Sequence, residues 1–223
     1  MEIIPVEDRG PISKAVVAAV EEVTGKTTHA CHHQACVGSI VINTILGGDY
    51  SMPASAKVWF SRSMWDGSGP TPWGLWNFKG ESLSGTFLHD FSVEHTYIVC
   101  WQSEPVDIVD FSLYQYETYF FDRWNLAWTW KRPYCWCPME RIPRAYQPFY
   151  VSDEPTTAKI MGSLSAEQNL ITTMALRALR LLGRTEEPFR PVWWDEPTLD
   201  ALIDGAHANP VEPETADIKY RIL

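Results

Sequence analysis

The chain has 223 residues with a formal net charge of −10, and 45% of the residues are hydrophobic. This length and apolar share are enough to bury a core and favour a single domain. No basic run is longer than Lys131-Arg132. Binding nucleic-acid phosphates needs clustered cations, so we expect no nucleic-acid partner.

The first ten residues, MEIIPVEDRG, are acidic where a secretory signal is basic, and no apolar run in the chain approaches a membrane-spanning length. We therefore expect a soluble, cytoplasmic protein with no membrane partner. The cysteines are an odd set: Cys31, Cys36, Cys100, Cys135 and Cys137. Without an export signal, this set favours reduced thiols over a disulfide framework.

The first predicted element is an amphipathic helix from Ile12 to Val23, followed by a loop from Lys26 to Ala35. A second helix is predicted from about Cys36 to Leu46, where Gly47-Gly48 would end it. Its apolar positions follow the i, i+3, i+4, i+7, i+8 pattern of a buried stripe: Val37, Ile40, Val41, Thr44 and Ile45.

Strand signals dominate the middle of the chain. The segment from Ala56 to Ser61 is β-branched and aromatic, and Trp73 to Lys79 is either a strand or an aromatic loop. From Thr86 to Trp101 the residues alternate with period two, which predicts one long bent strand or a strand pair. Val106 to Leu113 is the next predicted strand, joined to it by a hairpin.

The last third of the chain gives one clear element. Ser165 to Gln168 has a capping-box pattern, and apolar periodicity from there to Gly183 predicts a helix. Strands between Leu113 and Tyr150 can be placed only weakly. An acidic, proline-rich tail is expected from about residue 185, with a short helix from Leu199 to Ile203.

The candidate nucleophile is Cys36. In the first turn of its predicted helix, unpaired backbone N–H groups and the helix dipole favour an anion, which lowers the pKa of a thiol there. On the predicted hairpin, His95 and Asp110 can lie side by side, since paired Cβ atoms of neighbouring strands are within about 5.5 Å of each other. Together the three residues have the chemistry of a Cys-His-Asp triad.

This arrangement resembles the papain-like superfamily of cysteine hydrolases and transferases, in particular its transglutaminase-like and arylamine N-acetyltransferase-like branches. Three segments carry the resemblance, and they span Thr28 to Ser112: Cys36 with the apolar helix ending ILGG and then DYSMPASA, His95-Thr96-Tyr97-Ile98-Val99, and Ile108-Val109-Asp110-Phe111-Ser112. The chain as a whole is similar to a bacterial family of that superfamily.

The resemblance implies an α+β, papain-like cysteine proteinase fold, in which the helix carrying the cysteine packs on an antiparallel sheet carrying His95 and Asp110. It also implies acyl transfer through an acyl-cysteine, with a small-molecule or peptide acyl substrate and no cofactor. The backbone N–H of Cys36 would be the first oxyanion donor. Gln34 lies too close to Cys36 to take the role of the papain glutamine, so the second donor stays unassigned.

Several residues compete with the predicted triad. Cys31 is the rival nucleophile, although the residues after it give no helical stripe. His89 shares the predicted face of His95, and a one-residue register slip would exchange Asp110 for Asp107.

Two further functions also compete with catalysis. A zinc site could be built from Cys31, Cys36, Cys135 and Cys137. A catalytically silent protein could bind a peptide or small ligand in an aromatic cleft. The tryptophans available for such a cleft are Trp73, Trp76, Trp101 and the cluster from Trp124 to Trp130.

Overall fold

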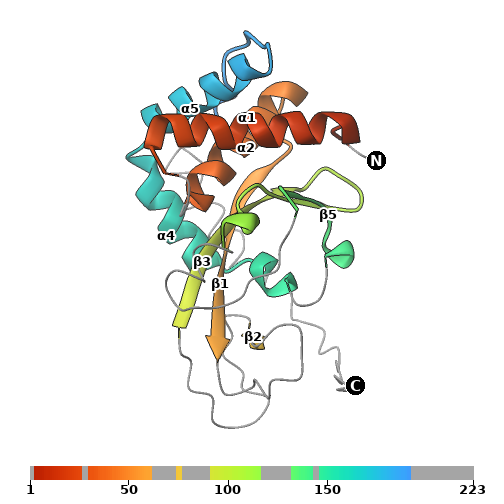
Figure 1. Ribbon diagram of the computed structural model, residues 1–223, viewed down its shortest axis with the longest axis vertical. Coiled ribbons are helices and arrows are strands. Elements are labelled where there is room, and N and C mark those ends of the chain that lie inside the picture. Colours follow the sequence, from red (N-terminus) through yellow and green to blue (C-terminus); the bar gives the residue numbers. More distant parts are fainter. Residues whose placement is uncertain are drawn as a thin grey trace, which may run out of the picture.

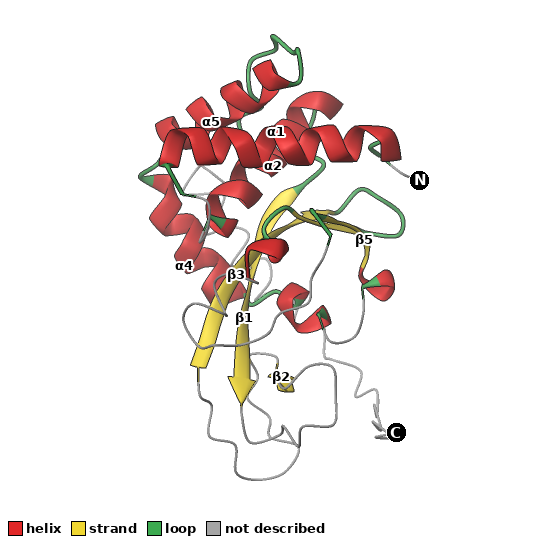
Figure 2. Cartoon of the chain, in the orientation of Figure 1, coloured by secondary structure: helices red, strands yellow, loops and turns green. Residues whose placement is uncertain are grey.

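The computed structural model describes residues 3–26, 30–61, 74–76, 91–116, 132–142 and 146–191. Within them the fold is α+β, with helices gathered around one end of an antiparallel sheet (Figure 1, Figure 2). The helices are α1 (Val6–Thr24), α2 (Cys31–Leu46), α4 (Glu154–Ser165) and α5 (Gln168–Leu181). The strands are β1 (Met52–Ser61), β2 (Gly74–Trp76), β3 (Phe91–Cys100), β4 (Asp107–Asp110) and β5 (Cys135–Pro138).

The described strands follow the order β2-β1-β3-β4-β5, and each neighbouring pair is antiparallel. β3 is central: Ala56 of β1 is opposite His95, and Val109 of β4 is opposite Ile98. The predicted hairpin between the long alternating strand and the next strand is therefore confirmed. The 3₁₀ helices η1 (Leu113–Gln115), η2 (Met139–Arg141) and η3 (Gln147–Tyr150) follow the strands.

Alternation along β3 divides the buried side chains between two cores, because successive residues of a strand point to opposite faces. Ile98 and Cys100 join a helical core built from α1, α2, α4 and α5. Val93 and Tyr97 join an aromatic core on the opposite face, which includes Phe149 and residues near the 3₁₀ helices. The sheet thus separates two packed layers.

Helix starts differ from the sequence prediction more than helix ends do. α2 begins at Cys31, five residues before the predicted Cys36, and ends at Leu46 with Gly47 in the left-handed conformation (φ 71°). α1 begins at Val6 and contains Pro11. The guanidinium of Arg9 bonds the carbonyl of Ile4, which holds this early turn in place.

The helix predicted to begin at Ser165 begins three residues later, because Ser165 belongs to a separate helix, α4. Ser165 ends α4, where its hydroxyl donates to the Gly162 carbonyl, and α5 begins at Gln168. The predicted capping role of Ser165 is therefore wrong. Helix α4 was missed, although its N-cap Asp153 and the proline after Glu154 are helix-start signals.

The part of the chain that the structure describes contains no helix with the length and apolarity needed to cross a bilayer. The predicted tail lies largely outside the described residues, which end at residue 191.

Candidate functional site

Asp110 and His95 form a buried pair between β3 and β4. His95 Nε2 lies 2.9 Å from Asp110 Oδ2, and both side chains are almost completely shielded from solvent. The pair forms because the β3–β4 register brings the end of β4 beside the middle of β3. The structure thus brings together two of the three predicted site residues.

The carboxylate of Asp110 is held at both oxygens. Oδ2 also accepts from the Tyr150 hydroxyl at 2.8 Å. Oδ1 accepts from the backbone N–H of Ser112 at 2.7 Å, from the Ser112 hydroxyl at 2.8 Å and from the N–H of Leu113 at 3.1 Å. Burial opposes ionisation, but the charge of His95 and these donors lower the pKa of Asp110. Its orientation and its negative charge are therefore fixed.

His95 is enclosed by aromatic side chains of the aromatic core. The Tyr116 ring meets it edge-on with centroids 5.3 Å apart, and Phe149 does so at 5.4 Å. Its other nitrogen, Nδ1, lies 2.9 Å from the Tyr116 hydroxyl. Burial disfavours the charged ring, but Asp110 outweighs burial and raises the pKa of His95 to about 9. The imidazole is therefore protonated at neutral pH.

The thiol whose charge state His95 influences belongs to Cys31, the first residue of α2. Cys31 is 8% exposed, and its sulfur lies 3.7 Å from His32 Nδ1. Burial alone would raise the pKa of this thiol. The charge of His32 and its contact with the sulfur, with a smaller effect of His95, lower it well below its usual value. A helix start, where unpaired N–H groups collect, is also the favoured place for a thiolate.

His32 is itself tied to the sheet. Its Nδ1 lies 2.5 Å from the hydroxyl oxygen of Thr96, and that oxygen is 2.9 Å from the Ser55 hydroxyl oxygen. Its pKa is raised because, against the effect of burial, the Cys31 thiolate favours a positive charge. His33 instead pairs with Glu167 at 2.8 Å. The polar first turn of α2 is thus anchored to β1, β3 and the α4–α5 junction.

Cys36 departs from the prediction. It lies one and a half turns inside α2, has no exposed surface and packs in the helical core. Burial, together with the negative charges of Cys31 and Glu167, raises the pKa of its thiol far above the usual value. Among the described contacts, none joins Cys36 to His95. The nucleophile therefore stays a prediction, and these surroundings favour Cys31, the rival thiol, over Cys36.

The strand register selects Asp110 over Asp107. Asp107 lies at the opposite end of β4, where its carboxylate is 3.9 Å from Arg9. His89, the competing histidine, lies outside the described residues.

The predicted zinc set containing Cys31 and Cys36 is not assembled, since these two thiols have the separate surroundings given above. Among the described residues, no group of three potential ligands could hold a metal ion.

The predicted aromatic cleft falls mostly on residues that the structure does not describe. Trp101 is 47% exposed just after β3, and the side chains of Trp73, Trp76 and the cluster from Trp124 to Trp130 lie outside the described part. Tyrosines and Phe149, which the sequence did not single out, surround His95 instead.

Gln34 has a notable position. It follows Cys31 by three residues on α2, and its amide is buried with neither atom hydrogen-bonded within the described residues. Residues three apart on a helix are neighbours. The Gln34 amide therefore lies about one turn from the Cys31 thiol, although the structure gives no contact that assigns it a role.

Comparison of the chain with family models, curated proteins and solved structures found no match in any of the three. A functional assignment therefore has to be argued from the residues and the geometry of the site.

Proposed function

We propose that the protein is a thiol-dependent acyl-transfer enzyme with a papain-like triad of Cys31, His95 and Asp110. One observation carries the proposal: a buried carboxylate holds the His95 imidazole in place, and this imidazole, together with His32, favours the thiolate of Cys31 at a helix start. The substrate class is an amide, peptide or thioester, because a thiolate attacks an acyl carbon and forms an acyl-cysteine.

Each group has a defined part in the reaction. The Cys31 thiolate attacks the carbonyl carbon, and the carbonyl oxygen becomes an oxyanion beside the first-turn N–H groups of α2. His95 then gives a proton to the leaving amine or thiol. In the deacylation step, the now neutral His95 removes a proton from water or another acyl acceptor. This acceptor attacks the acyl-cysteine and releases the Cys31 thiolate. Asp110 keeps the imidazole in one tautomer and stabilises its positive charge.

The two cysteines of α2 provide a matched experiment. Parent, Cys31→Ala and Cys36→Ala proteins would be treated with p-nitrophenyl acetate, and acetylated residues would be located by peptide mass spectrometry. We expect a burst of nitrophenol and an acetyl group on Cys31 in the parent and in Cys36→Ala. Cys31→Ala should lose both signals and retain the fold, as judged by circular dichroism.

Labelling with iodoacetamide at pH 6 tests the thiolate separately. An ordinary thiol with a pKa near 8.5 is almost completely protonated at that pH, so Cys31 should react at least about tenfold faster than a protonated thiol. Fast labelling without acylation would indicate the alternative, a catalytically silent binding protein on the same scaffold. Acylation that persists in Cys31→Ala would contradict the triad.

A further inference from the structure

Two cysteines outside the proposed triad lie together on β5. Cys135 and Cys137 are two residues apart and therefore on the same face of the strand, and their sulfurs are 3.9 Å apart. Cys135 is buried, whereas Cys137 is half-buried. Among the described strands β5 lies at the edge of the sheet, paired with β4 alone.

The two thiols differ in protonation. A hydrogen bond from Cys135 lowers the pKa of Cys137, and the positive charges of Arg132 and Arg141 assist against the effect of burial. The same hydrogen bond, burial and the negative charge of Asp110 raise the pKa of Cys135. The more accessible thiol, Cys137, is therefore the one whose pKa is lowered, and the buried thiol of Cys135 is the one whose pKa is raised.

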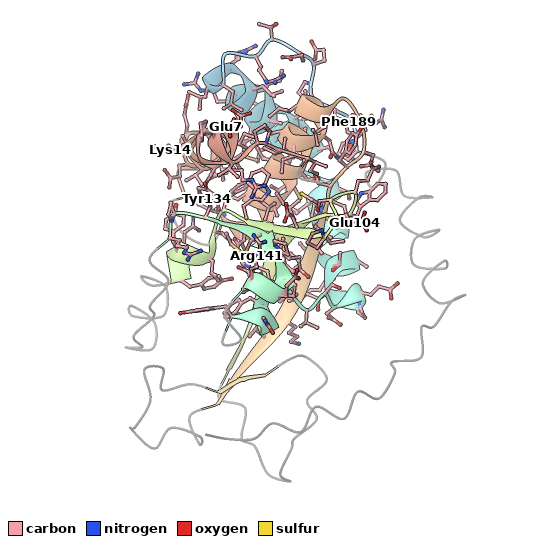
Figure 3. All side chains as sticks on the ribbon, turned by 90° about the vertical axis from the view of Figure 1, so that its right-hand side faces the viewer. Glu7, Lys14, Glu104, Tyr134, Arg141 and Phe189 are labelled. Atoms are coloured by element: carbon pink, nitrogen blue, oxygen red, sulfur yellow. The ribbon has the colours of Figure 1, made fainter. Side chains whose placement is uncertain are left out.

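A cavity of about 320 Å³ opens at this pair. Both sulfur-bearing residues line it, together with Arg9, Arg132 and Arg141. Arg141 and Tyr134, which also lines the cavity, are labelled in the view onto this side of the molecule (Figure 3). A concave site with a thiolate and several guanidinium groups suits a small molecule that carries carboxylates.

We propose that Cys135 and Cys137 form a redox-active dithiol that reduces a small anionic disulfide bound beside Arg141 and Arg132. The Cys137 thiolate attacks one sulfur of that disulfide, which forms a mixed disulfide and releases one thiolate. Cys135 then loses its proton and attacks the Cys137 sulfur, which forms the Cys135–Cys137 bond and releases the second thiolate. Two electrons pass from the protein to the bound disulfide.

The strand geometry favours a reversible bond. Residues two apart on a strand have Cα atoms about 6.6 Å apart, near the upper limit for disulfides. Closing the bond must therefore bend β5, which its single neighbour permits. A strained disulfide is readily reduced again. The site is therefore suited to cycling between its two states.

The test uses the full chain with Cys31→Ala, so that the proposed acyl-transfer nucleophile takes no part and the two proposals fail independently. Glutathione disulfide at neutral pH is the probe. We expect the protein to lose two thiols, and the peptide containing Cys135 and Cys137 to become lighter by two hydrogens. Adding Cys135→Ser should trap glutathione on Cys137, and adding Cys137→Ser should prevent both reactions.

Two controls define specificity. Cys100→Ala should leave the reaction unchanged, because Cys100 is buried and burial raises the pKa of its thiol to about 12. Arg141→Gln should slow thiol loss with glutathione disulfide by about threefold or more. The rate with the uncharged 2-hydroxyethyl disulfide should stay within about twofold of the rate without this substitution. Retention of all thiols, or equal thiol loss in Cys135→Ser and Cys137→Ser, would overturn the proposal.

Discussion

Asp110 has the most fully satisfied side chain of the site, and its charge favours the protonated state of His95. Its two oxygens accept from His95, Tyr150, Ser112 and Leu113. A buried carboxylate with this many donors stays ionised, and a buried imidazole beside it stays protonated. Asp110 therefore contributes to the thiolate of Cys31 through the charge of the His95 imidazole, in addition to the larger effect of His32.

Replacing Asp110 by Asn tests this dependence. The amide keeps the shape but removes the charge, so the pKa of His95 should fall and that of Cys31 should rise. We expect iodoacetamide labelling of Cys31 at pH 6 to slow by about tenfold or more, and the pH at half-maximal rate to move upward. The rate of modification at Cys31 between pH 5 and 9, followed by peptide mass spectrometry, measures both effects.

Asp107→Asn is the matched control for this prediction. Asp107 lies on the same strand, is also buried, and is paired with Arg9 away from the site. The pH profile of Cys31 labelling in Asp107→Asn should coincide with that of the parent. Coincident profiles for Asp110→Asn and the parent would show that the carboxylate does not set the state of the thiol.

The sequence could pair two residues of the proposed triad, but it favoured a different thiol from the one that the structure favours. Period-two alternation and the hairpin were sufficient to pair His95 with Asp110. Cys36 was preferred to Cys31 because the prediction took the start of the apolar stripe as the start of the helix. The first turn of α2 is polar, since His32 pairs with Thr96 and His33 with Glu167. Those contacts come from distant elements, so local periodicity does not reveal them.

At the scale of elements, the contact between α2 and β3 positions the thiol relative to the imidazole. Gly38 lies at this contact, and a Cβ added there would be 2.4 Å from Phe111 Cε2 and 2.7 Å from Ile98 Cδ1. Such distances require the Phe111 and Ile98 side chains, or the elements that carry them, to shift. The absence of a side chain at Gly38 therefore allows α2 to approach the sheet closely.

Gly38→Ala should consequently destabilise the protein by about 1–3 kcal/mol, as overpacking of a core does. It should also slow labelling of Cys31 at pH 6, because the start of α2 would be displaced from His95. Gly162→Ala in α4 is the control, since nothing lies within 4 Å of the added Cβ. Alanine is the better helix former by up to about 1 kcal/mol, so that variant should be neutral or stabilised.

Urea unfolding would give both stability changes. A Gly38→Ala protein as stable as Gly162→Ala would contradict the close approach of α2 to β3.

Element boundaries show the same limit of local sequence information. The strand predicted from Ala56 begins at Met52, because its pairing with β3 extends through Pro53 and Ala54. Helix α4 is fixed at its start by contact with β1, where the N–H of Asp153 donates to the Ser55 carbonyl at 2.7 Å. Helix ends marked by glycine, such as Gly47, were predictable. Helix and strand starts that depend on pairing with distant segments were not.

For the whole molecule, the candidate site lies where two cores meet. The start of α2 comes from the helical layer, and His95 and Asp110 are held among aromatic side chains on the other face of the sheet. The helices next to Gly47 and Gly183 and the central hairpin followed from hydrophobic periodicity. The division into two cores did not, because it depends on which 3₁₀ segments cover the second face.

This arrangement makes the stability of the whole protein depend on two titrations of opposite sign. The pKa of Cys31 is lowered on folding, so its contribution to stability increases with pH up to the unfolded value of about 8.5. The pKa of His95 is raised to about 9, so its contribution is complete below the unfolded value of about 6.5 and is lost as pH rises through 9. Between about pH 6.5 and 8.5 the two contributions oppose each other.

Replacing Cys31 should leave the titration of His95 without the opposing titration of the thiol. In Cys31→Ala the free energy of unfolding should fall more steeply with pH than in the parent, by up to about 1.4 kcal/mol per pH unit across that window. Proton uptake by His32, whose raised pKa depends on Cys31, reduces this difference and cancels it if His32 takes up one full proton on folding. Urea unfolding at pH 6.5, 7.5 and 8.5 would measure it.

Cys36→Ala is the matched control. It should follow the parent closely, because the buried thiol of Cys36 stays protonated and its unfolded form titrates only at the upper end of the window. A curve that falls more steeply with pH in the parent than in Cys31→Ala would contradict a thiolate at Cys31.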